Sequence, residues 1–569
     1  MPAPTAARRS SVFALIPELS REVAWRALRP LRVGWRRNGL YRSLLKGRMP
    51  DRIGYQPDDA LPRRLQEADA LFKGRFRFAD ETVAVAEGSV FDCPAPSRAW
   101  IEGLHGFDWL SPLATANGDA ARVLAARLMT EWLARNGRYG EPAWLPEVTA
   151  RRLVQIFSHG RFVLANSDML WRSRVFVSLR EQSRLLARTV SEAEPGLPRL
   201  EAAAANVLAG ICLSDGPRRV DAALDRLEGE LAEQILPDGG HVSRSPEQLL
   251  EAYRHIAMAT EALLSRRVAV PPGLRSAHDR VAPMLRFFRH GDGGLAMFNG
   301  GREGDPRMIS NLLERDEVRG QPFLHAPHSG YQRLAAPHAI VILDCGAPPK
   351  GALSRQAHAG CLSFEMSTGG QRLVVNCGAE LSRWNGALRA TAAHSTITLA
   401  DTSMAGILPA GLLHDLLGAR LTNGPVRIDT ARENTQQGSH VVARHDGYLH
   451  TFGLLHERRM ILSPQGTRLS GKDRLVPAGA QARRSPVPFA ARFHIHPDVR
   501  VSRSQRGDIL LKLPSGEGWR FRFEGDASVE ESVYAGGETV RRAEQLVICG
   551  AVKEQPVEFE WGFERIGSA

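Results

Sequence analysis

The sequence lacks several signatures that would assign it to common classes of protein. Its six cysteines are scattered and form no CxxC pair, which excludes a zinc ribbon and predicts no disulfide framework. No apolar run reaches the roughly 18 residues that a transmembrane helix needs. Neither a G-x-S-x-G nucleophile elbow nor a glycine-rich phosphate loop followed by Lys and Ser or Thr is present. The cysteines are therefore expected to be small buried residues or free thiols.

The sequence also shows no recognisable secretory signal peptide. Arg8 and Arg9 precede a short apolar stretch, but Pro17 and Glu18 interrupt it before an adequate apolar region forms. The sequence by itself therefore predicts a cytoplasmic protein. At 569 residues, with 43% hydrophobic and 24% charged residues, the chain has a globular composition and is long enough for two or three cores.

The net charge of +12 is concentrated at the N-terminus. Residues 1–78 hold 17 Lys and Arg against 7 Asp and Glu, with apolar residues such as Trp25, Leu28 and Trp35 between them. Such an arm could bind an anionic membrane surface or an acidic glycan. Alternatively, it is an amphipathic helix that packs its apolar face on the body and solvates its arginines. No nucleic-acid motif accompanies the charge, so nucleic acid is not an expected partner.

Residues 96–325 are expected to form a helical domain after a lead-in over residues 1–95. Apolar residues recur at helical spacing between Arg122 and Trp132. Further helices are predicted over 147–165, 172–190, 198–213, 217–236, 246–266 and 273–289. Many helices of similar length joined by short loops favour paired helices in a ring or solenoid.

Residues 326–569 have a different sequence pattern, which consists of short β-type runs bounded by turn residues. Strands are predicted over 339–343, 362–366, 373–375, 396–399, 458–462, 492–496, 509–513, 519–523 and 545–549. Short strands without intervening helices indicate an antiparallel sandwich. The expected fold class is thus α+β, with an N-terminal helical domain followed by a C-terminal β-sandwich.

Several segments resemble the heparinase II/III family of polysaccharide lyases. The order and spacing of these segments over some 350 residues carry the resemblance. The segments are W-I-E-G-L-H-G-F-D-W-L at 100–110, L-P-D-G-G-H at 236–241 with Ser245 and Pro246, H-A-G-C-L-S-F-E at 358–365, N-C-G at 376–378, A-H-S-T at 393–396 and H-D-G-Y at 445–448. The resemblance implies an (α/α) toroid, a β-sandwich and an acidic polysaccharide as partner. It also implies a location in the cell envelope or periplasm.

The family's reaction is β-elimination on uronic-acid polymers such as heparin or alginate. The enzyme must neutralise the uronate carboxylate, remove the C5 proton and protonate the departing glycosidic oxygen. A tyrosine base needs nearby positive charge, because its unperturbed pKa is about 10.

This sequence departs from the family at chemical positions. Gln248 stands where the cleft segment typically has Tyr, and Gln356 stands where lyases often carry a second His. The Asp of H-A-D is Gly360, and the Asp of D-x-G, a metal ligand in some members, is Asn376. Neither glutamine titrates, so each is expected at most to bind substrate through its amide.

The residues left for acid–base work are a tyrosine and three histidines. Tyr448 is the best remaining phenol, with His445 as a neighbour able to lower its pKa; an ordinary strand tyrosine is the alternative. His241 follows two glycines, and either faces a ligand or is satisfied locally. His358 and His394 complete the candidate catalytic set.

Two arginines and one metal site are further candidates. Arg244 and Arg389 could clamp a carboxylate in two parallel bonds. His358, Asn376 and His394 could hold a divalent metal, Zn or Ca, although no cofactor is certain. A regular strand from His358 through Met366 and a four-residue loop would put His358 and Asn376 on opposite faces, whereas a bulge or another register could bring them together.

Two functions therefore remain open. The first is a polysaccharide lyase acting on an acidic glycan. The second is a catalytically degenerate glycan-binding or cell-envelope assembly protein that keeps the scaffold without the acid–base set. Fold alone does not settle function. The feature that separates the two functions is the presence of Gln248 and Gln356 where the family has Tyr and His, because neither amide can act as an acid or a base.

Overall fold

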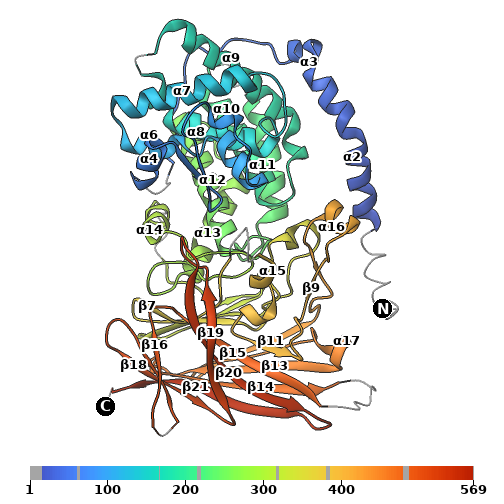
Figure 1. Cartoon of the computed structure of the whole chain (residues 1–569), viewed down its shortest axis with the longest axis vertical. Coiled ribbons are helices and arrows are strands. Elements are labelled where there is room, and N and C mark those ends of the chain that lie inside the picture. The colour runs from blue at the N-terminus through green and yellow to red at the C-terminus, as the bar shows by residue number, and fades with distance from the viewer. Residues whose placement is uncertain are drawn as a thin grey trace. The chain divides into compact units, whose positions relative to one another are not determined.

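A computed structural model describes residues 16–59, 65–165, 167–214, 219–315, 320–379, 385–478, 486–505 and 507–567 (Figure 1). The chain forms two compact units. The helical unit comprises Ser20–Ile235 and Glu251–Asp279. The sheet unit comprises Met1–Leu19, Leu236–Leu250 and Arg280–Ala569. Neither unit is continuous in sequence.

Helices dominate the N-terminal half and appear blue to green in Figure 1. They are α2 (Ile16–Arg37), α3 (Gly39–Leu44), α4 (Leu65–Phe72), α5 (Arg98–Gly106), α6 (Leu110–Ala116), α7 (Gly118–Asn136), α8 (Pro146–Leu164), α9 (Met169–Thr189), α10 (Leu197–Cys212), α11 (Val220–Gln234), α12 (Pro246–Ser265), α13 (Pro272–Phe288) and α14 (Pro306–Glu314). The six helices predicted from spacing are confirmed by α8 to α13. A hairpin of β1 (Arg75–Phe78) and β2 (Glu81–Ala84) accompanies them.

Local signals explain where these helices begin. Ser97 and Asp168 cap α5 and α9 by accepting hydrogen bonds from backbone N–H groups of their first turns. Pro146 and Glu147 open α8, which suits a helix start because the first turn needs no proline N–H and its dipole favours acidic residues. The tryptophans Trp100 and Trp132 are almost completely buried and build the core.

Helix α2 exposes its large apolar side chains and forms ion pairs to the helical unit through two of its arginines. Arg29 pairs with Glu141, and Arg36 pairs with Glu192, so arginines attach this helix to the helical unit. Leu31 is 71% exposed, and Trp35 is 50% exposed. The expectation that the apolar face packs on the body is therefore wrong, whereas the side chains of Arg26 and Arg29 are 46% and 57% exposed and so are solvated as expected. Among the described residues, no helix is long and apolar enough to cross a membrane.

Two antiparallel sheets make up most of the sheet unit. One has eight strands in the order β11–β12–β13–β14–β21–β18–β17–β16, and the other has the path β19–β20–β15–β7–β6–β5–β4–β3, with β8 pairing to β15. The strands of the first sheet are β11 (Ile428–Thr435), β12 (Gly438–His445), β13 (Leu454–Leu462), β14 (Arg468–Pro477), β16 (Arg500–Arg503), β17 (Ile509–Lys512), β18 (Gly518–Phe523) and β21 (Val557–Ile566). Those of the second are β3 (His325–Ala326), β4 (Tyr331–Ala335), β5 (Ala339–Asp344), β6 (Phe364–Thr368), β7 (Gln371–Val375), β8 (Ile397–Leu399), β15 (Val487–Ile495), β19 (Ala527–Tyr534) and β20 (Arg541–Val552).

Short elements connect these strands. They are α15 (Asn385–Leu388), β9 (Gly406–Ile407), α16 (Leu412–Leu417), β10 (Leu421–Thr422) and α17 (Leu449–Phe452). The sandwich core is rich in aromatic rings, and Phe493 lies 4.7 Å from Trp561 between ring centroids. Cysteines are free thiols in the described chain, and four of the six are buried, as predicted.

The region around His358 differs from the regular strand considered above. Leu362 adopts a left-handed φ of 58°, which breaks the chain direction before β6 begins at Phe364. Thr368 pairs with Gln371, so the hairpin loop has two residues, and a bulge lies between Met366 and Ser367. The assumed four-residue loop is therefore wrong, and both a bulge and a different register are found.

Candidate functional site

Gln248 and Gln356, which the sequence analysis interprets as departures from the family pattern, are hydrogen-bonded to each other in the sheet unit. The Gln248 amide donates to the side-chain oxygen of Gln356 at 3.1 Å. Gln356 is exposed and Gln248 is half-buried, so the pair reaches solvent. The two substitutions thus form one feature of the molecule, although 108 residues separate them.

Buried arginines hold the segments that carry these glutamines. Arg389 donates to the carbonyls of Ser354 and Ala357 at 2.8 and 2.9 Å, on either side of Gln356. Burial lowers the pKa of Arg389 to about 10. Its contacts to the backbone through Nε and Nη2 fix the Gln356 segment, and its role as a carboxylate clamp stays a prediction.

Arg244 does the same for the segment that precedes Gln248. Its guanidinium pairs with Asp344 and donates to the carbonyls of Ser329 and Gly346 at 2.8 and 3.0 Å. It also lies over the Tyr331 ring, 4.7 Å from the centroid. These bonds use its Nε, Nη1 and Nη2 groups inside the protein, so Arg244 is placed to hold backbone.

His358 and His394 lie together, with ring centroids 4.8 Å apart. His358 Nε2 accepts a hydrogen bond from the Gly300 N–H at 3.0 Å, so the proton of the neutral ring is on Nδ1. Among the described residues, neither that Nδ1 nor either ring nitrogen of His394 has a hydrogen-bond partner. Burial lowers the pKa of His358 to about 3 and lowers that of His394 well below its usual value, so both rings are neutral at pH 7.

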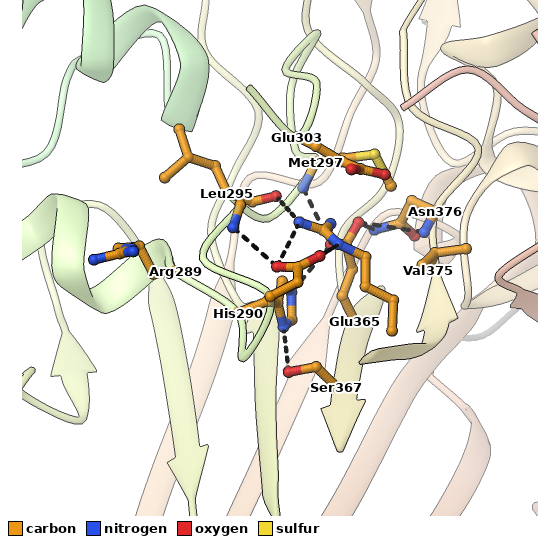
Figure 2. A network of polar contacts seen from close by, with 12 residues as sticks. Arg289, His290, Leu295, Met297, Glu303, Glu365, Ser367, Val375 and Asn376 are labelled. Atoms are coloured by element: carbon orange, nitrogen blue, oxygen red, sulfur yellow. Dashed lines mark hydrogen bonds and ion pairs between the residues drawn. The ribbon is translucent and has the colours of Figure 1, made fainter. Parts of the chain in front are cut away.

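Asn376 belongs to a buried network centred on Glu365 (Figure 2). Its Nδ2 donates to Glu365 Oε1 at 3.1 Å, and its Oδ1 accepts from the Ser395 N–H at 3.0 Å. The other Glu365 oxygen accepts from His290 and from the Met297 N–H, both at 3.2 Å. An aspartate at 376 would place a second carboxylate against Glu365, which explains in physical terms why an amide suits this position.

The proton positions in this network follow from its donors. Ser367 Oγ accepts from the Gly291 N–H, so its hydroxyl is free to donate to His290 Nδ1. The proton of neutral His290 is then on Nε2, which donates to Glu365. Burial lowers the pKa of His290 although Glu365 opposes this, in agreement with a neutral ring.

The candidate metal set His358, Asn376 and His394 has two imidazoles with free nitrogens but no anionic third ligand. Both functional atoms of Asn376 are already bonded, to Glu365 and to the backbone of Ser395. Zinc sites typically use three or four protein ligands, and calcium requires several oxygens. These residues as arranged do not fit either ion.

Tyr448 and His241 are both buried side chains of the sheet unit. Tyr448 is 1% exposed in the sandwich core, where its hydroxyl donates to the Ile397 carbonyl at 2.7 Å, and burial raises its pKa. His241 is equally buried, with its Nδ1 2.7 Å from Ser243 Oγ, and burial lowers its pKa to about 4. Neither side chain is accessible to a substrate in this structure.

The helical unit has a polar cluster that the sequence reasoning missed. Glu201, Glu251 and His255 each offer one ligand atom, and these atoms lie within 4.8 Å of one another, which is compatible with a shared metal ion. Arg254 also contacts this cluster, through Glu251 at 2.9 Å and His255 Nε2 at 3.1 Å. Burial alone would raise the pKa of Glu201, but the hydrogen bond from His255 and the nearby Arg151 and Arg254 lower it to about 2.

Spacing could have revealed part of that cluster. Glu251 and His255 are four residues apart on α12, so they share one helix face. Glu201 lies on α10, and nothing in the local sequence distinguishes it from a solvated acid.

Comparisons with known proteins agree with this fold. The family described as Heparinase II/III-like, C-terminal, matches residues 318–562. FtsZ-localized protein C of Caulobacter vibrioides is 32% identical over 549 residues, covering 94% of each chain.

Solved lyase structures share the architecture at low sequence identity. A crystal structure of heparinase III has a TM-score of 0.69 at 14% identity, covering 98% of this chain and 92% of that one. The heparan sulfate lyase HepC from Pedobacter heparinus has a TM-score of 0.57 at 16% identity, covering 93% and 87%. At this identity the likeness shows the fold alone, and it confirms the expected helical domain followed by antiparallel sheets.

Proposed function

Because the chain belongs to the heparinase II/III family, we propose that it binds an acidic glycan with the lyase scaffold and does not cleave it. The observation that carries this proposal is the Gln248–Gln356 hydrogen bond. Amides can bind sugar hydroxyls, but they cannot remove a C5 proton or protonate a leaving group at neutral pH.

Burial of the other candidates supports the same conclusion. Tyr448 is in the sandwich core, and His358 and His394 are buried neutral rings with lowered pKa values. A base whose conjugate acid has a pKa near 3 is poorly matched to proton removal at pH 7. The partner-free nitrogens of the two histidines nevertheless favour a second candidate, a lyase that uses this pair instead of tyrosine.

A screen of acidic polysaccharides tests both candidates. Absorbance of unsaturated uronide products reports cleavage, and calorimetry reports binding. We expect binding without an absorbance increase. An increase that is lost in His358→Ala and His394→Ala would replace the binding proposal with the lyase.

The role of the glutamines has its own control. We expect the double variant Gln248→Ala and Gln356→Ala to bind the glycan about 10-fold more weakly, since each neutral hydrogen bond contributes about 0.5–1.5 kcal/mol. Gln437→Ala removes an exposed glutamine elsewhere in the sheet unit and should bind as the wild type does. Equal weakening in both variants would contradict the assignment.

We further propose an envelope-assembly role at the division site, supported by the resemblance to FtsZ-localized protein C. The basic arm would contribute by binding an anionic membrane. Helix α2 exposes Leu28, Leu31 and Trp35 beside arginines, the composition of an interfacial helix.

Vesicle sedimentation tests the membrane contact. Leu31→Glu should reduce binding to anionic vesicles severalfold, because the charged side chain cannot enter the lipid interface. Leu264→Glu, an equally drastic change at an exposed leucine of the helical unit, is the matched control. Unchanged sedimentation of Leu31→Glu would exclude α2 as the membrane contact.

A further inference from the structure

Glu201, Glu251 and His255 bring three ligand-type side chains together in the helical unit. Their ligand atoms lie within 4.8 Å of one another, and Glu201 Oε1 is 3.3 Å from His255 Nε2. A zinc ion holds nitrogen and oxygen ligands about 2.0–2.2 Å away, so the ligand atoms of one ion are typically about 3–4.4 Å apart. Small rotations of the two glutamates therefore suffice to bring all three side chains onto one ion.

Hydrogen bonding leaves the imidazole of this cluster incompletely satisfied. His255 Nε2 lies 3.1 Å from Arg254 Nη2, which can only donate, and 3.3 Å from the Glu201 carboxylate, which can only accept when ionised. One ring nitrogen either donates or accepts, so it can satisfy only one of these two neighbours. The other ring nitrogen, Nδ1, is buried and has no hydrogen-bond partner among the described residues. Protein contacts alone thus do not account for a buried imidazole at this position.

The Glu201 carboxylate is available as an anionic ligand. Its side chain is 16% exposed, and within the part of the chain that the structure describes its one ion-pair contact is with His255. The hydrogen bond from His255 and the nearby Arg151 and Arg254 keep the pKa of Glu201 at about 2 in spite of burial. The group is therefore ionised at neutral pH and needs no deprotonation to bind a cation.

Arg254 contacts the cluster, but two other carboxylates hold its guanidinium. Its Nε donates to Glu251 Oε2 and its Nη1 donates to Asp59 Oδ1, both at 2.9 Å. These bonds leave Glu251 Oε1 for an ion, and both can persist when His255 Nε2 directs its lone pair to a metal. Arg254 then keeps Glu251 in place, as hydrogen-bonded groups behind metal ligands commonly do.

The ligand set indicates which class of ion fits. Calcium takes about six to eight oxygen ligands, which three side chains that include an imidazole do not supply. Zinc is commonly bound by three protein ligands drawn from His, Glu and other donors, with water at the fourth position. Carboxylates alone would suit Mn²⁺, whereas an imidazole shifts the preference toward zinc. Two carboxylates and one imidazole therefore favour zinc over manganese and exclude calcium.

We propose that the helical unit binds one divalent transition metal, zinc by preference, through Glu201, Glu251 and His255. The ion links α10 to α12, and water completes its coordination. All three ligands belong to the helical unit, whereas the metal set predicted from the sequence belongs to the sheet unit and does not fit an ion. The inference goes beyond the proposed function and does not depend on glycan binding.

Calorimetry on the full chain tests the site after dialysis against a chelator. The probes are Zn²⁺, Mn²⁺ and Ca²⁺, each added as a simple salt. We expect one zinc ion to bind per chain, manganese to bind more weakly and calcium not to bind. Because the ion binds the folded state and joins two helices, saturating zinc should also raise the temperature of thermal unfolding.

Variants make the assignment specific. Glu201→Gln and His255→Gln each replace a ligand and should weaken zinc binding by at least about 10- to 100-fold, the loss caused even by removing a group that supports a ligand. Glu233→Gln and His278→Gln make the same changes at an exposed glutamate and a half-buried histidine of the helical unit, and both should bind zinc as the wild type does. If the buried His255→Gln does not fold, the partly exposed Glu201→Gln still tests the site.

Each outcome decides the proposal. Zinc binding that is lost in Glu201→Gln and retained in Glu233→Gln would support it. Absence of zinc binding, or equal zinc affinities of the wild type and both ligand variants, would overturn it. Zinc that is lost from His358→Ala and His394→Ala but retained by Glu201→Gln would also overturn it, because the ion would then belong to the sheet unit. The zinc titration contains no glycan, so a failure of glycan binding bears only on the proposed function.

Discussion

Asp473 should be the residue whose neutralisation costs the sandwich most. Its carboxylate is completely buried and accepts four hydrogen bonds, two from Arg458, one from His456 and one from Trp561, all between 2.7 and 2.8 Å. Burial alone would raise the pKa of Asp473, but Arg458 and His456 lower it well below the usual range. The carboxylate is therefore ionised and neutralises a buried arginine.

Asp473→Asn keeps the shape and removes the charge. Because each carboxylate oxygen accepts from two donors, either orientation of the asparagine places an NH₂ group against two donors. Arg458 is then left buried without its counter-ion. Breaking a buried pair in this way typically costs about 3–5 kcal/mol. We expect a loss of that size in the free energy of unfolding at pH 7.

Urea denaturation followed by tryptophan fluorescence measures this loss, since Trp561 bonds directly to Asp473. Asp429→Asn, which removes an exposed acid paired with Arg444, should leave the transition unchanged. Since the folded pKa of Asp473 is depressed, its contribution is present above about pH 4 and disappears as the pH falls below that value. A loss under about 1 kcal/mol, or a loss that persists unchanged at pH 2, would refute the reasoning.

Three further predictions concern other buried groups. Asn376→Asp sets a second carboxylate about 3.1 Å from Glu365 and should destabilise the protein at pH 7, with recovery near pH 4 where one carboxyl protonates. Urea midpoints of the variant and the wild type at the two pH values test this prediction. An equal loss of stability at both pH values would contradict it. Burial lowers the pKa of His241 to about 4 and that of His358 to about 3. Their stabilising contribution to the free energy of unfolding is therefore complete above pH 6.5, and it falls by about 1.4 kcal/mol per pH unit for each histidine as the pH drops toward those pKa values. A free energy of unfolding that stays constant between pH 7.5 and 5 would refute this prediction. Tyr448→Phe removes one buried hydrogen bond and should cost about 0.5–1.5 kcal/mol in thermal or urea unfolding while leaving glycan binding unchanged, whereas lost binding would restore a functional role.

The order of helices and strands could be predicted because burial follows simple periods. A β-type run predicted a strand over 458–462, which is the C-terminal part of β13, and burial alternates along the whole strand. The same period places Arg458 on the buried side, directly opposite Asp473 on β14. Composition alone would have assigned both to the surface, because an isolated charge is rarely buried.

The candidate site was harder to predict. Leu362 takes a left-handed conformation without being glycine, and no local sequence signal marks it. The contact between Gln248 and Gln356 joins two distant segments, so only the three-dimensional structure reveals it. The family motifs identified the positions, while tertiary packing decided that Arg244 and Arg389 bond to backbone.

The discontinuous sheet unit has a consequence for the order of folding during synthesis. The segment Leu236–Leu250 leaves the ribosome well before Asp344, which lies 100 residues after its partner Arg244. At typical rates of about 5–20 residues per second, Arg244 waits roughly 5–20 s for its counter-ion. Closing so long a loop is entropically unfavourable until strands β4 and β5 form. A nascent chain halted before Asp344 should therefore be cut by proteases within residues 236–250, and a chain released after β5 should resist cleavage there.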